Sequence, residues 1–512
     1  MARKYDVVVV GAGLGGLSAA TLLAKKGLNV LLLEKHNVPG GYATSFVRGR
    51  YEFEVALHEL SGVGTPEHPS SLHRYLNYLG VAERVEFIHM PYFYRSIFPD
   101  LDIRLPVGRE KYEDVMCESF PRDAKGIKRF IGRFFELEHE LVRLMKLTES
   151  KKLPSLVEIA TLPINLRTLL RYAFTTWAQV LNRDVKDPKA RAVLSQIWGY
   201  FGLPPSKISY LYFANAMASY IKNGPTYIKG RSQALSNAFV TAFEEHGGEV
   251  RFNCGAQKIT TSNGRITGVI TEDGEEILAN CVVSNASPVT TCRDLIGVKN
   301  VPQSFFNRLR SSTVGASSVI VYMGVARSPA KLRIDDHEVF INANYDFESH
   351  YEKMKVVGLP EGMVAGCYNH VFPEVSPSGT SMVVLTTLAY GEPWTKIPPE
   401  QYVRTKNRVA DAMISMAEKV LPGLRKYAEV VEVATPITNM RYTRTLGGAI
   451  YGFDQPPSDA TVWRISHKGP LEGLYFVGAW TPPGGGFEPS MLSGRMAGEM
   501  ISRKVKKTKR GA

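Results

Sequence analysis

The chain has 512 residues, which exceeds the size of one compact core and predicts about two to four domains. Hydrophobic residues make up 44% of it and charged residues 22%, a balance that excludes a disordered, collagenous or coiled-coil protein. The net charge of +13 would suit a nucleic-acid partner, but no recognisable binding module accompanies it, so we expect no nucleic acid.

The opening of the chain predicts one βαβ unit. It consists of a strand over residues 5–10, a glycine turn over 11–16, a helix over 17–26 and a second strand over 29–33. The continuous apolar runs in both strands suit a parallel sheet that is buried on both faces.

The glycine turn, G-A-G-L-G-G, fits the G-x-G-x-x-G pattern between a strand and a helix. Gly11 permits the tight turn, Gly13 lets the backbone approach a pyrophosphate, and Gly16 lets the helix and strand pack closely. Glu34 ends the second strand, where a carboxylate accepts hydrogen bonds from a ribose diol and repels a 2′-phosphate. Together they predict a dinucleotide site that disfavours NADP.

Residues 121–222 are predicted to be mostly helical. Within them, residues 143–191 contain ten basic and four acidic residues, and apolar residues recur at helical spacing over 166–181 after a start marked by Pro163 and Asn165. Such a basic amphipathic helix can lie in a membrane interface, where each cation near anionic lipid contributes about 1 kcal/mol. We therefore expect peripheral contact with an anionic membrane; an ordinary core-facing helix is the alternative. No apolar run approaches the ~18 residues of a membrane-spanning helix, so an integral membrane protein is not expected.

The second half of the chain predicts two sheets. The expected elements are a helix over 232–245, a strand over 249–253, hairpin turns at 262–264 and 273–274, strands over 318–324 and 381–389, a helix over 399–420, a strand over 474–477 and a helix over 490–504. The last strand and helix repeat the opening pattern, so the first and last segments are expected to share one nucleotide-binding sheet. Residues 501–512 hold six basic residues and no acid, which would add to the membrane attraction.

Two further glycine turns favour FAD over NAD. The sequence K-H-N-V-P-G-G-Y over 35–42 directly follows Glu34 and could clear space along the pyrophosphate. Gly478 and Ala479 follow the last predicted strand and precede P-G-G-G over 483–486 and a helix. The positive N-terminus of that helix could stabilise the anion of a reduced flavin.

The motifs together resemble the flavoprotein family of phytoene desaturases, carotenoid cis-trans isomerases and retinol saturases. The matching pieces are V-V-V-G-A-G-L-G-G-L-S-A-A, L-L-E-K-H-N-V-P-G-G, N-G-R-I-T-G-V with V-V-S-N-A, and G-L-Y-F-V-G-A-W-T-P-P-G-G-G-F-E-P-S-M-L-S-G. They span the whole length. Phytoene desaturases usually carry an arginine after the second glycine pair, whereas Tyr42-Ala43-Thr44 is closer to the isomerase and saturase branches.

The resemblance implies an α/β fold: a doubly wound, Rossmann-like FAD-binding domain, an inserted α+β substrate domain and a helical membrane-facing part. It places the FAD-binding domain in residues 1–120, 226–297 and 451–512, the helical part in 121–225 and the substrate sheet in 298–450. The implied FAD-binding residues are Gly11, Gly13, Gly15, Gly16, Glu34, Lys35, Gly40, Gly41, Tyr42, Ala256, Gly478, Ala479 and Met491.

Candidates for proton handling are few. His58 and Glu59 lie in a stretch that resembles a family segment running back towards the flavin, and a neutral histidine can act as acid or base. A structural histidine is the alternative. Glu488 in the terminal turn could take part in catalysis or cap the last helix. Arg441 and Arg444 could bind a carboxylate or phosphate head group, or pair with nearby acids.

Three functions remain open at this point. The first is an FAD-dependent oxidoreductase that desaturates, saturates or isomerises C–C/C=C bonds of a lipophilic polyene such as a carotenoid or retinoid. The second is a flavin amine oxidase, and the third is a non-catalytic flavin-bearing lipid carrier. The five scattered cysteines form no C-x-x-C motif, which predicts free thiols in a reducing cytoplasm and no metal site. The oligomeric state stays open.

Overall fold

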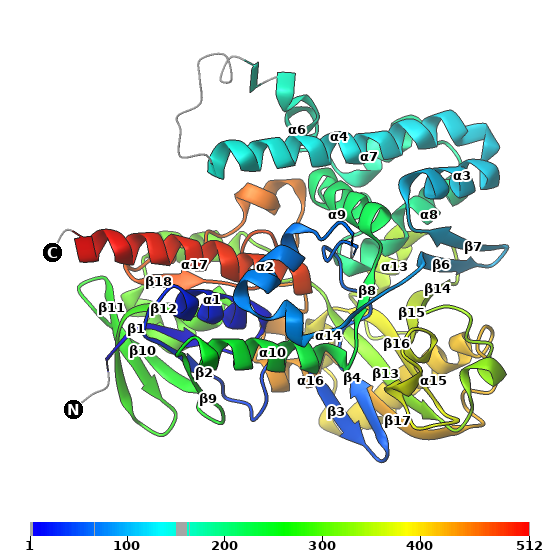
Figure 1. Ribbon diagram of the computed structural model, residues 1–512. Coiled ribbons are helices and arrows are strands. Elements are labelled where there is room, and N and C mark those ends of the chain that lie inside the picture. The colour runs from blue at the N-terminus through cyan, green and yellow to red at the C-terminus, as the bar shows by residue number, and fades with distance from the viewer. Residues whose placement is uncertain (1–3, 66, 150–160, 163, 511–512) are drawn as a thin grey trace.

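The computed structural model describes residues 4–65, 67–149, 161–162 and 164–510. Two seven-stranded sheets stand next to each other, and a group of helices covers them from one side (Figure 1). The helix start predicted at Pro163 lies outside the described residues, as do the last two residues of the basic tail.

The first sheet has the strand order β10-β11-β12-β1-β2-β9, with β18 paired to β12. Its strands are β1 (Lys4–Val10), β2 (Val30–Leu33), β9 (Glu249–Arg251), β10 (Ala256–Ser262), β11 (Arg265–Thr271), β12 (Glu276–Ser284) and β18 (Leu474–Phe476). The central strand β12 pairs in parallel with both β1 and β18. The prediction that the first and last segments share one sheet is therefore confirmed.

Three helices cover one face of this sheet: α1 (Leu14–Lys25), α10 (Arg231–Glu245) and α17 (Phe487–Arg510). The last helix lies against the first because its contact face is built from glycine. A Cβ at Gly494 would lie only 2.7 Å from the Ser18 Cβ, and one at Gly498 only 2.8 Å from the Leu22 side chain. This close approach ties the C-terminal segment to the opening βαβ unit.

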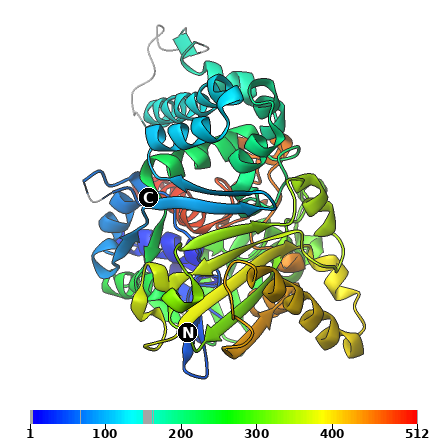
Figure 2. The same cartoon turned by 90° about the vertical axis from the view of Figure 1, so that its right-hand side faces the viewer.

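The second sheet has the order β17-β13-β16-β15-β14-β6-β7. Its strands are β6 (Tyr92–Phe98), β7 (Leu101–Pro106), β13 (Ser317–Val325), β14 (Glu338–Asn342), β15 (Gly362–Cys367), β16 (Ser381–Ala389) and β17 (Ala428–Ala434). Helix α15 (Pro399–Ala417) packs on its outer face through Val409, Met413 and Ile414. The β6–β7 hairpin lies directly beneath the helices (Figure 2).

The β6–β7 hairpin corrects one predicted boundary. It falls within residues 1–120, which the sequence assigns to the FAD-binding domain, yet β6 pairs in parallel with β14 of the second sheet. Similarly, β8 (Thr226–Ile228) falls within the predicted middle part of that domain but pairs with β5 (Phe87–His89) outside the first sheet. Strand patterns predict that a strand forms, but they carry no information about which distant strand it joins.

The helical layer consists of α3 (Arg109–Ser119), α4 (Ala124–Glu149), α6 (Arg167–Tyr172), α7 (Trp177–Asp184), α8 (Pro188–Ser195) and α9 (Tyr210–Asn223). The single amphipathic helix predicted over 166–181 is wrong, because the chain leaves the helix after Tyr172 and starts a new one at Trp177. Thr176 caps α7 by accepting a hydrogen bond from the Gln179 backbone N–H at 3.3 Å.

Shorter elements include β3 (Ser45–Arg48), β4 (Tyr51–Glu54), α2 (Ser71–Leu79), α11 (Pro288–Thr290), α12 (Gln303–Arg310), α13 (Phe347–Lys353), α14 (Gly391–Thr395) and α16 (Pro436–Thr443). All five cysteines are free thiols. Among the described residues, no helix combines the length and apolar character needed to cross a membrane.

Candidate cofactor and substrate site

A cavity of ≈ 2240 Å³ runs between the two sheets and the helical layer. Single drug-sized ligands occupy pockets of roughly 300–1,000 Å³, so this cavity has room for two large ligands. One end is lined by the glycine turns of the first sheet, and the other by apolar side chains of α4, α6, α9 and the second sheet.

The first glycine turn places the N-terminus of α1 at the wall of the cavity. Gly13 is the N-cap of α1, no side chain of the described residues caps this end of the helix, and no acidic residue stands in its first turn. Asn285, at the carboxyl end of β12, packs over the turn, so that a Cβ at Gly13 would lie 2.5 Å from the Asn285 Nδ2. A Cβ at Gly16 would overlap the Gly11 carbonyl oxygen. Only glycine therefore fits at Gly16, whereas a Cβ at Gly13 would have to displace the Asn285 side chain.

Glu34 lies where the sequence predicts it, at the cavity end of β2. Its Oε2 accepts a hydrogen bond from the Ala12 N–H at 2.7 Å, and its Oε1 accepts one from the His36 N–H at 2.8 Å. These bonds hold the carboxylate in place beside the glycine turn. Burial, followed by the positive charge of Arg444, lowers the pKa of the neighbouring Lys35. Arg444 itself pairs with Glu272 at 3.3 Å, as the alternative assignment for this arginine predicts.

The second glycine turn packs against the first. The Gly40 N–H donates to the Ala12 carbonyl at 2.8 Å, and Gly40 adopts φ +117°, which favours glycine. Tyr42 donates to the Gly448 carbonyl at 3.2 Å and so joins this turn to the segment after α16. The two turns together form one wall of the cavity.

The C-terminal turn closes the same end. Gly478, at φ +86°, donates its N–H to the Ser493 Oγ at 2.9 Å. Met491 is fully buried, and its carbonyl accepts a hydrogen bond from Ser18 at 2.7 Å. Of the predicted FAD-binding residues, the cavity is lined by Gly11, Gly13, Gly15, Glu34, Lys35, Gly40, Gly41, Tyr42, Ala256, Gly478 and Ala479. Gly16 and Met491 lie behind the wall and hold it together.

These residues fit FAD. The uncapped N-terminus of α1 supplies donors for a pyrophosphate, and the fixed Glu34 carboxylate supplies acceptors for a ribose diol. A family model described as flavin containing amine oxidoreductase matches residues 14–501. The chain belongs to this flavoenzyme family. FAD is its cofactor, and the protein is an FAD-dependent oxidoreductase.

Two relatives of this flavoenzyme have names that refer to polyenes, namely prolycopene and retinol. Prolycopene isomerase 1, chloroplastic, of an Oncidium hybrid cultivar is 25% identical and covers 98% of this chain and 84% of its own length. All-trans-retinol 13,14-reductase of Danio rerio is 26% identical and covers 93% of this chain and 82% of its own. A structure of wild-type putrescine oxidase bound to putrescine has a TM-score of 0.63 at 15% identity, covering 98% of this chain and 99% of its own, which shows a shared fold.

Polar candidates lie in the same cavity as the glycine turns. His58 lines the cavity, its Nε2 lies 3.4 Å from the Thr386 Oγ1, and its Nδ1 has no hydrogen-bond partner among the described residues. Burial lowers the pKa of His58 to about 4, so its ring is neutral near pH 7. Glu488, in the first turn of α17, accepts a hydrogen bond from Ser61 at 2.5 Å, and burial raises its pKa.

Glu59 also lines the cavity, and the structure adds a residue that the sequence does not predict. The carboxyl of Glu59 lies beside that of Glu338, the first residue of β14: both residues line one small space, and burial and the charge of Glu338 raise the pKa of Glu59. Tyr200 donates to the Glu338 Oε1. Both carboxyls are buried, with exposures of 9% and 2%. The sequence offers one signal for Glu338: a charged residue that begins an otherwise apolar strand.

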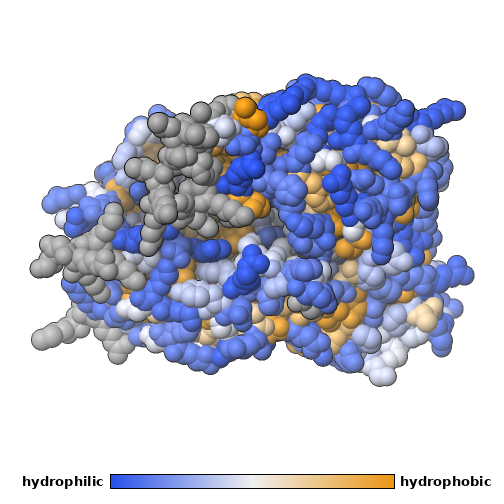
Figure 3. Space-filling view, turned by 45° about the horizontal axis from the view of Figure 1, so that its top comes forward, coloured by the Kyte–Doolittle hydropathy of each residue, from blue (hydrophilic) through white to orange (hydrophobic). Residues whose placement is uncertain are grey.

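The walls of the cavity beyond these groups are mostly apolar, and so is part of its rim. Leu170, Phe174, Val462 and Trp463 line the cavity and yet expose half or more of their surface. The rings of Phe174 and Trp463 stand 5.8 Å apart, which joins the turn after α6 to the C-terminal segment at this rim. Viewed towards the helical layer, apolar side chains gather in and beside a hollow of this face (Figure 3).

Proposed function

We propose that this flavoenzyme acts on C–C/C=C bonds of a hydrophobic polyene, such as a carotenoid or retinoid. The observation that carries the proposal is the single cavity that joins the FAD-fitting glycine turns to long apolar walls. A polyene offers few polar groups, so its binding must come from apolar burial, at about 0.8 kcal/mol per CH₂ group. The names of the prolycopene isomerase and retinol reductase relatives support this substrate class.

Each part of the cavity has a proposed role. The N-terminus of α1 binds the pyrophosphate, Glu34 the ribose, and the turns at Gly40 and Gly478 hold the cofactor in place. Bound FAD supplies hydride exchange with a substrate carbon. The apolar walls orient the polyene and exclude water, while Glu59, His58 and Glu488 are the groups in reach that can hold or accept a proton.

The proposed location is the cytoplasmic surface of an anionic membrane. The exposed apolar rim formed by Leu170, Phe174, Val462 and Trp463 supports this placement, as do the exposed Arg143, Arg167 and Arg171 in the same helical layer. A polyene that passes from the bilayer through the rim would reach the cavity without crossing water. The basic tail continues α17 as far as Arg510, and its part in membrane contact stays a prediction.

The test uses purified holoenzyme under anaerobic conditions, with the flavin absorption band as the readout. All-trans-retinol and prolycopene serve as polyene probes, and putrescine serves as the amine probe. We expect the enzyme to convert at least one polyene probe. Loss of flavin colour would indicate desaturation, and reoxidation of reduced flavin would indicate saturation. Conversion that needs reduced flavin but consumes none would indicate isomerisation. A protein that takes up no FAD, or that reacts with putrescine alone, would overturn the proposal.

A further inference from the structure

Two carboxyl groups meet against the wall of the cavity, and the nearby Arg95 pairs with Asp102 and Asp336 instead of with either of them. Glu59 comes from the loop after β4, and Glu338 opens β14 of the second sheet. Among the described residues neither has an ion-pair partner, and both oxygens of Glu59 and one of Glu338 lack an N–H or O–H donor. Buried carboxylates in such a setting are stable only if a proton is shared between them.

The contacts decide which carboxyl holds that proton. Tyr200 already donates to Glu338, and a donor stabilises the charged form of the group that accepts. Burial, followed by the charge of Glu338, raises the pKa of Glu59 well above its ordinary value, whereas burial raises that of Glu338 only to about 7. Glu59 is therefore the protonated partner and donates to the Glu338 carboxylate.

The surrounding groups do not compete as acids near neutral pH. Burial lowers the pKa of His58 to about 4 and that of His337 to about 3, so both rings are neutral. The charges of the pair act on Tyr94, Tyr220, Tyr368, Tyr451 and Cys367, and Glu488 acts on Tyr220, while Arg95, Asp336 and His370 line the small space beside the pair. Burial raises the pKa of these tyrosines, of the thiol and of Glu488, so none of the tyrosines or the thiol ionises near pH 7.

A second, small cavity lies behind the pair. Its volume is ≈ 20 Å³, and its lining includes Glu59, Glu338, His370, the partly exposed Tyr92, and the ion pair of Arg95 with Asp336. One water molecule needs roughly 10–15 Å³ and two to four polar partners, so this space can hold one. Such a water would connect the pair to the outer side of β6, away from the large apolar cavity, and provide a route by which the proton is replaced.

We propose that Glu59, held by the Glu338 carboxylate, is the catalytic acid that gives its proton to one carbon of the substrate double bond. This inference rests on the proposed function. In saturation, a bound reduced flavin would supply the hydride for the neighbouring carbon, so that proton and hydride replace the π bond by two C–H bonds and two electrons pass to the substrate. In isomerisation, the proton adds to the polyene, the adjacent bond rotates, and the proton returns to Glu59 with no net redox change.

The protonated state of Glu59 bears on whether the enzyme desaturates, saturates or isomerises its substrate. A desaturase needs a base that takes a proton from carbon, whereas Glu59 already carries one near neutral pH. The inference therefore favours saturation or isomerisation over desaturation. Glu338 and Tyr200 are positioning residues, because neither lies between Glu59 and the substrate carbon in this scheme: Glu338 lines only the small cavity, and Tyr200 acts through Glu338.

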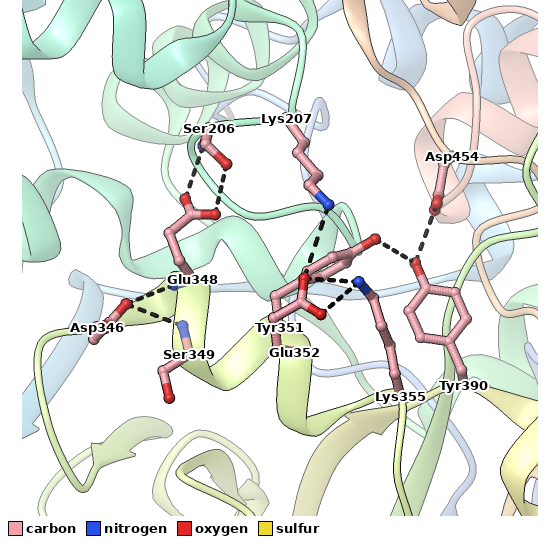
Figure 4. A network of polar contacts seen from close by, with 10 residues as sticks. All are labelled: Ser206, Lys207, Asp346, Glu348, Ser349, Tyr351, Glu352, Lys355, Tyr390 and Asp454. Carbon is pink, nitrogen blue, oxygen red and sulfur yellow. Dashed lines mark hydrogen bonds and ion pairs between the residues drawn. The ribbon is translucent and has the colours of Figure 1, made fainter.

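The experiment compares Glu59→Gln, Glu338→Gln and Glu338→Asp with a matched control, Asp454→Asn. Asp454 is also a buried carboxyl that accepts from a tyrosine, Tyr390, at 3.1 Å (Figure 4). Neither residue lines the large cavity. Each holoenzyme, with its flavin content and melting temperature checked, is assayed with all-trans-retinol and prolycopene under reducing conditions. Infrared spectra taken near pH 8.5 report protonated carboxyl groups independently of turnover.

We expect Glu59→Gln to lower kcat at least about 100-fold with KM within about twofold, and to remove an infrared band of a protonated carboxyl. Glu338→Gln removes the negative neighbour, so Glu59 ionises more easily and the alkaline limb of the pH profile moves to lower pH. Glu338→Asp keeps the charge and restores the wild-type profile, and Asp454→Asn leaves kcat within about twofold.

Any of three results overturns the inference. The first is a retained kcat in Glu59→Gln, and the second is an unchanged pH profile in Glu338→Gln. The third is a carboxyl band that survives in Glu59→Gln but not in Glu338→Gln. If the wild-type enzyme converts neither polyene, the proposed function fails instead. In that case the infrared band still decides whether Glu59 holds the proton.

Discussion

Glu54 is a buried carboxyl at the end of β4 that holds this strand to α10. It is fully buried and accepts hydrogen bonds from the Ser232 N–H at 2.8 Å and the Ser232 Oγ at 2.5 Å. Burial raises its pKa from 4.5 to about 7, against the opposing effect of these bonds. The folded protein therefore binds a proton on Glu54 in a pH range where the unfolded chain has released it.

The sign of the pH dependence follows from this raised pKa. The folded state binds more protons than the unfolded state between about pH 4.5 and 7, so stability falls as the pH rises through that window and stays low above it. Glu54→Gln mimics the protonated carboxyl and removes this loss. We expect the variant to match wild type near pH 5 and to exceed it above pH 7 by up to about 3 kcal/mol, seen as a higher melting temperature.

Glu52→Gln is the matched control on the same strand, because its carboxylate pairs with Arg231 at 3.0 Å near the surface. A gain for Glu54→Gln that is equal near pH 5 and pH 8.5 would show that the carboxyl does not titrate in this range.

Sequence reasoning finds residues whose partners are close in the chain. Glu34 is predicted because its distance from the glycine turn is set by one βαβ unit, and the structure places its carboxylate on that turn. Asn285 and Glu338 are not predicted as site residues, because their contacts with Gly13 and Glu59 join segments that only the folded sheets bring together. The roles of the remaining candidates depend on ligands, which a sequence pattern does not place.

At the scale of elements, most predicted helices and strands form within a few residues of their expected bounds. Strand β16 forms over residues 381–389 as predicted, since β-branched and apolar residues fill it and loops end it. The exception is residues 166–181, where the apolar residues at helical spacing serve two different surfaces. Leu170 and Phe174 are exposed at the rim, whereas Trp177, Val180 and Leu181 are buried in the helical core.

This division predicts opposite outcomes for two aromatic residues of that segment. Trp177 is fully buried, donates its Nε1–H to the Ser195 Oγ at 2.9 Å and packs on Phe213 at 4.3 Å between ring centroids. We expect Trp177→Ala to destabilise the protein by about 3–5 kcal/mol, measured as a fall in melting temperature. Phe174→Ala, at 67% exposure, should change stability by less than about 0.5 kcal/mol.

Equal melting temperatures for the two variants would contradict the break between α6 and α7. That result would instead fit the single membrane-surface helix that the apolar spacing predicts, in which both aromatic rings face lipid.

At the scale of the whole molecule, the site depends on parts that are remote in sequence. The first and last segments meet at β12, the helical layer covers the second sheet, and the cavity lies where these three parts converge. Sequence patterns predict the two ends of this arrangement, because each repeats a strand–glycine turn–helix unit. They do not predict the cavity itself, because its walls combine α4, α9 and β14, which no local pattern relates.

The same arrangement predicts which face of the molecule meets a membrane. If the cavity opens to lipid at the rim, a charge at Phe174 or Trp463 must enter the bilayer interface, whereas a charge on the opposite side of the molecule does not. We expect Phe174→Glu and Trp463→Glu each to weaken binding to vesicles of phosphatidylcholine and phosphatidylglycerol by roughly tenfold or more, since burying one such side chain contributes about 1.5–3 kcal/mol. Vesicle flotation measures this change.

Val403→Glu is the control for that experiment, because Val403 is also exposed (59%) but lies on α15, which covers the outer face of the second sheet and does not line the cavity. Binding by the control should match wild type, and added salt should weaken binding by all variants through Arg143, Arg167 and Arg171. Equal vesicle binding by Phe174→Glu, Trp463→Glu and Val403→Glu would show that the apolar rim does not contact lipid. The rim would then serve only to admit substrate from solution, because its aromatic pair would still stand at the mouth of the cavity.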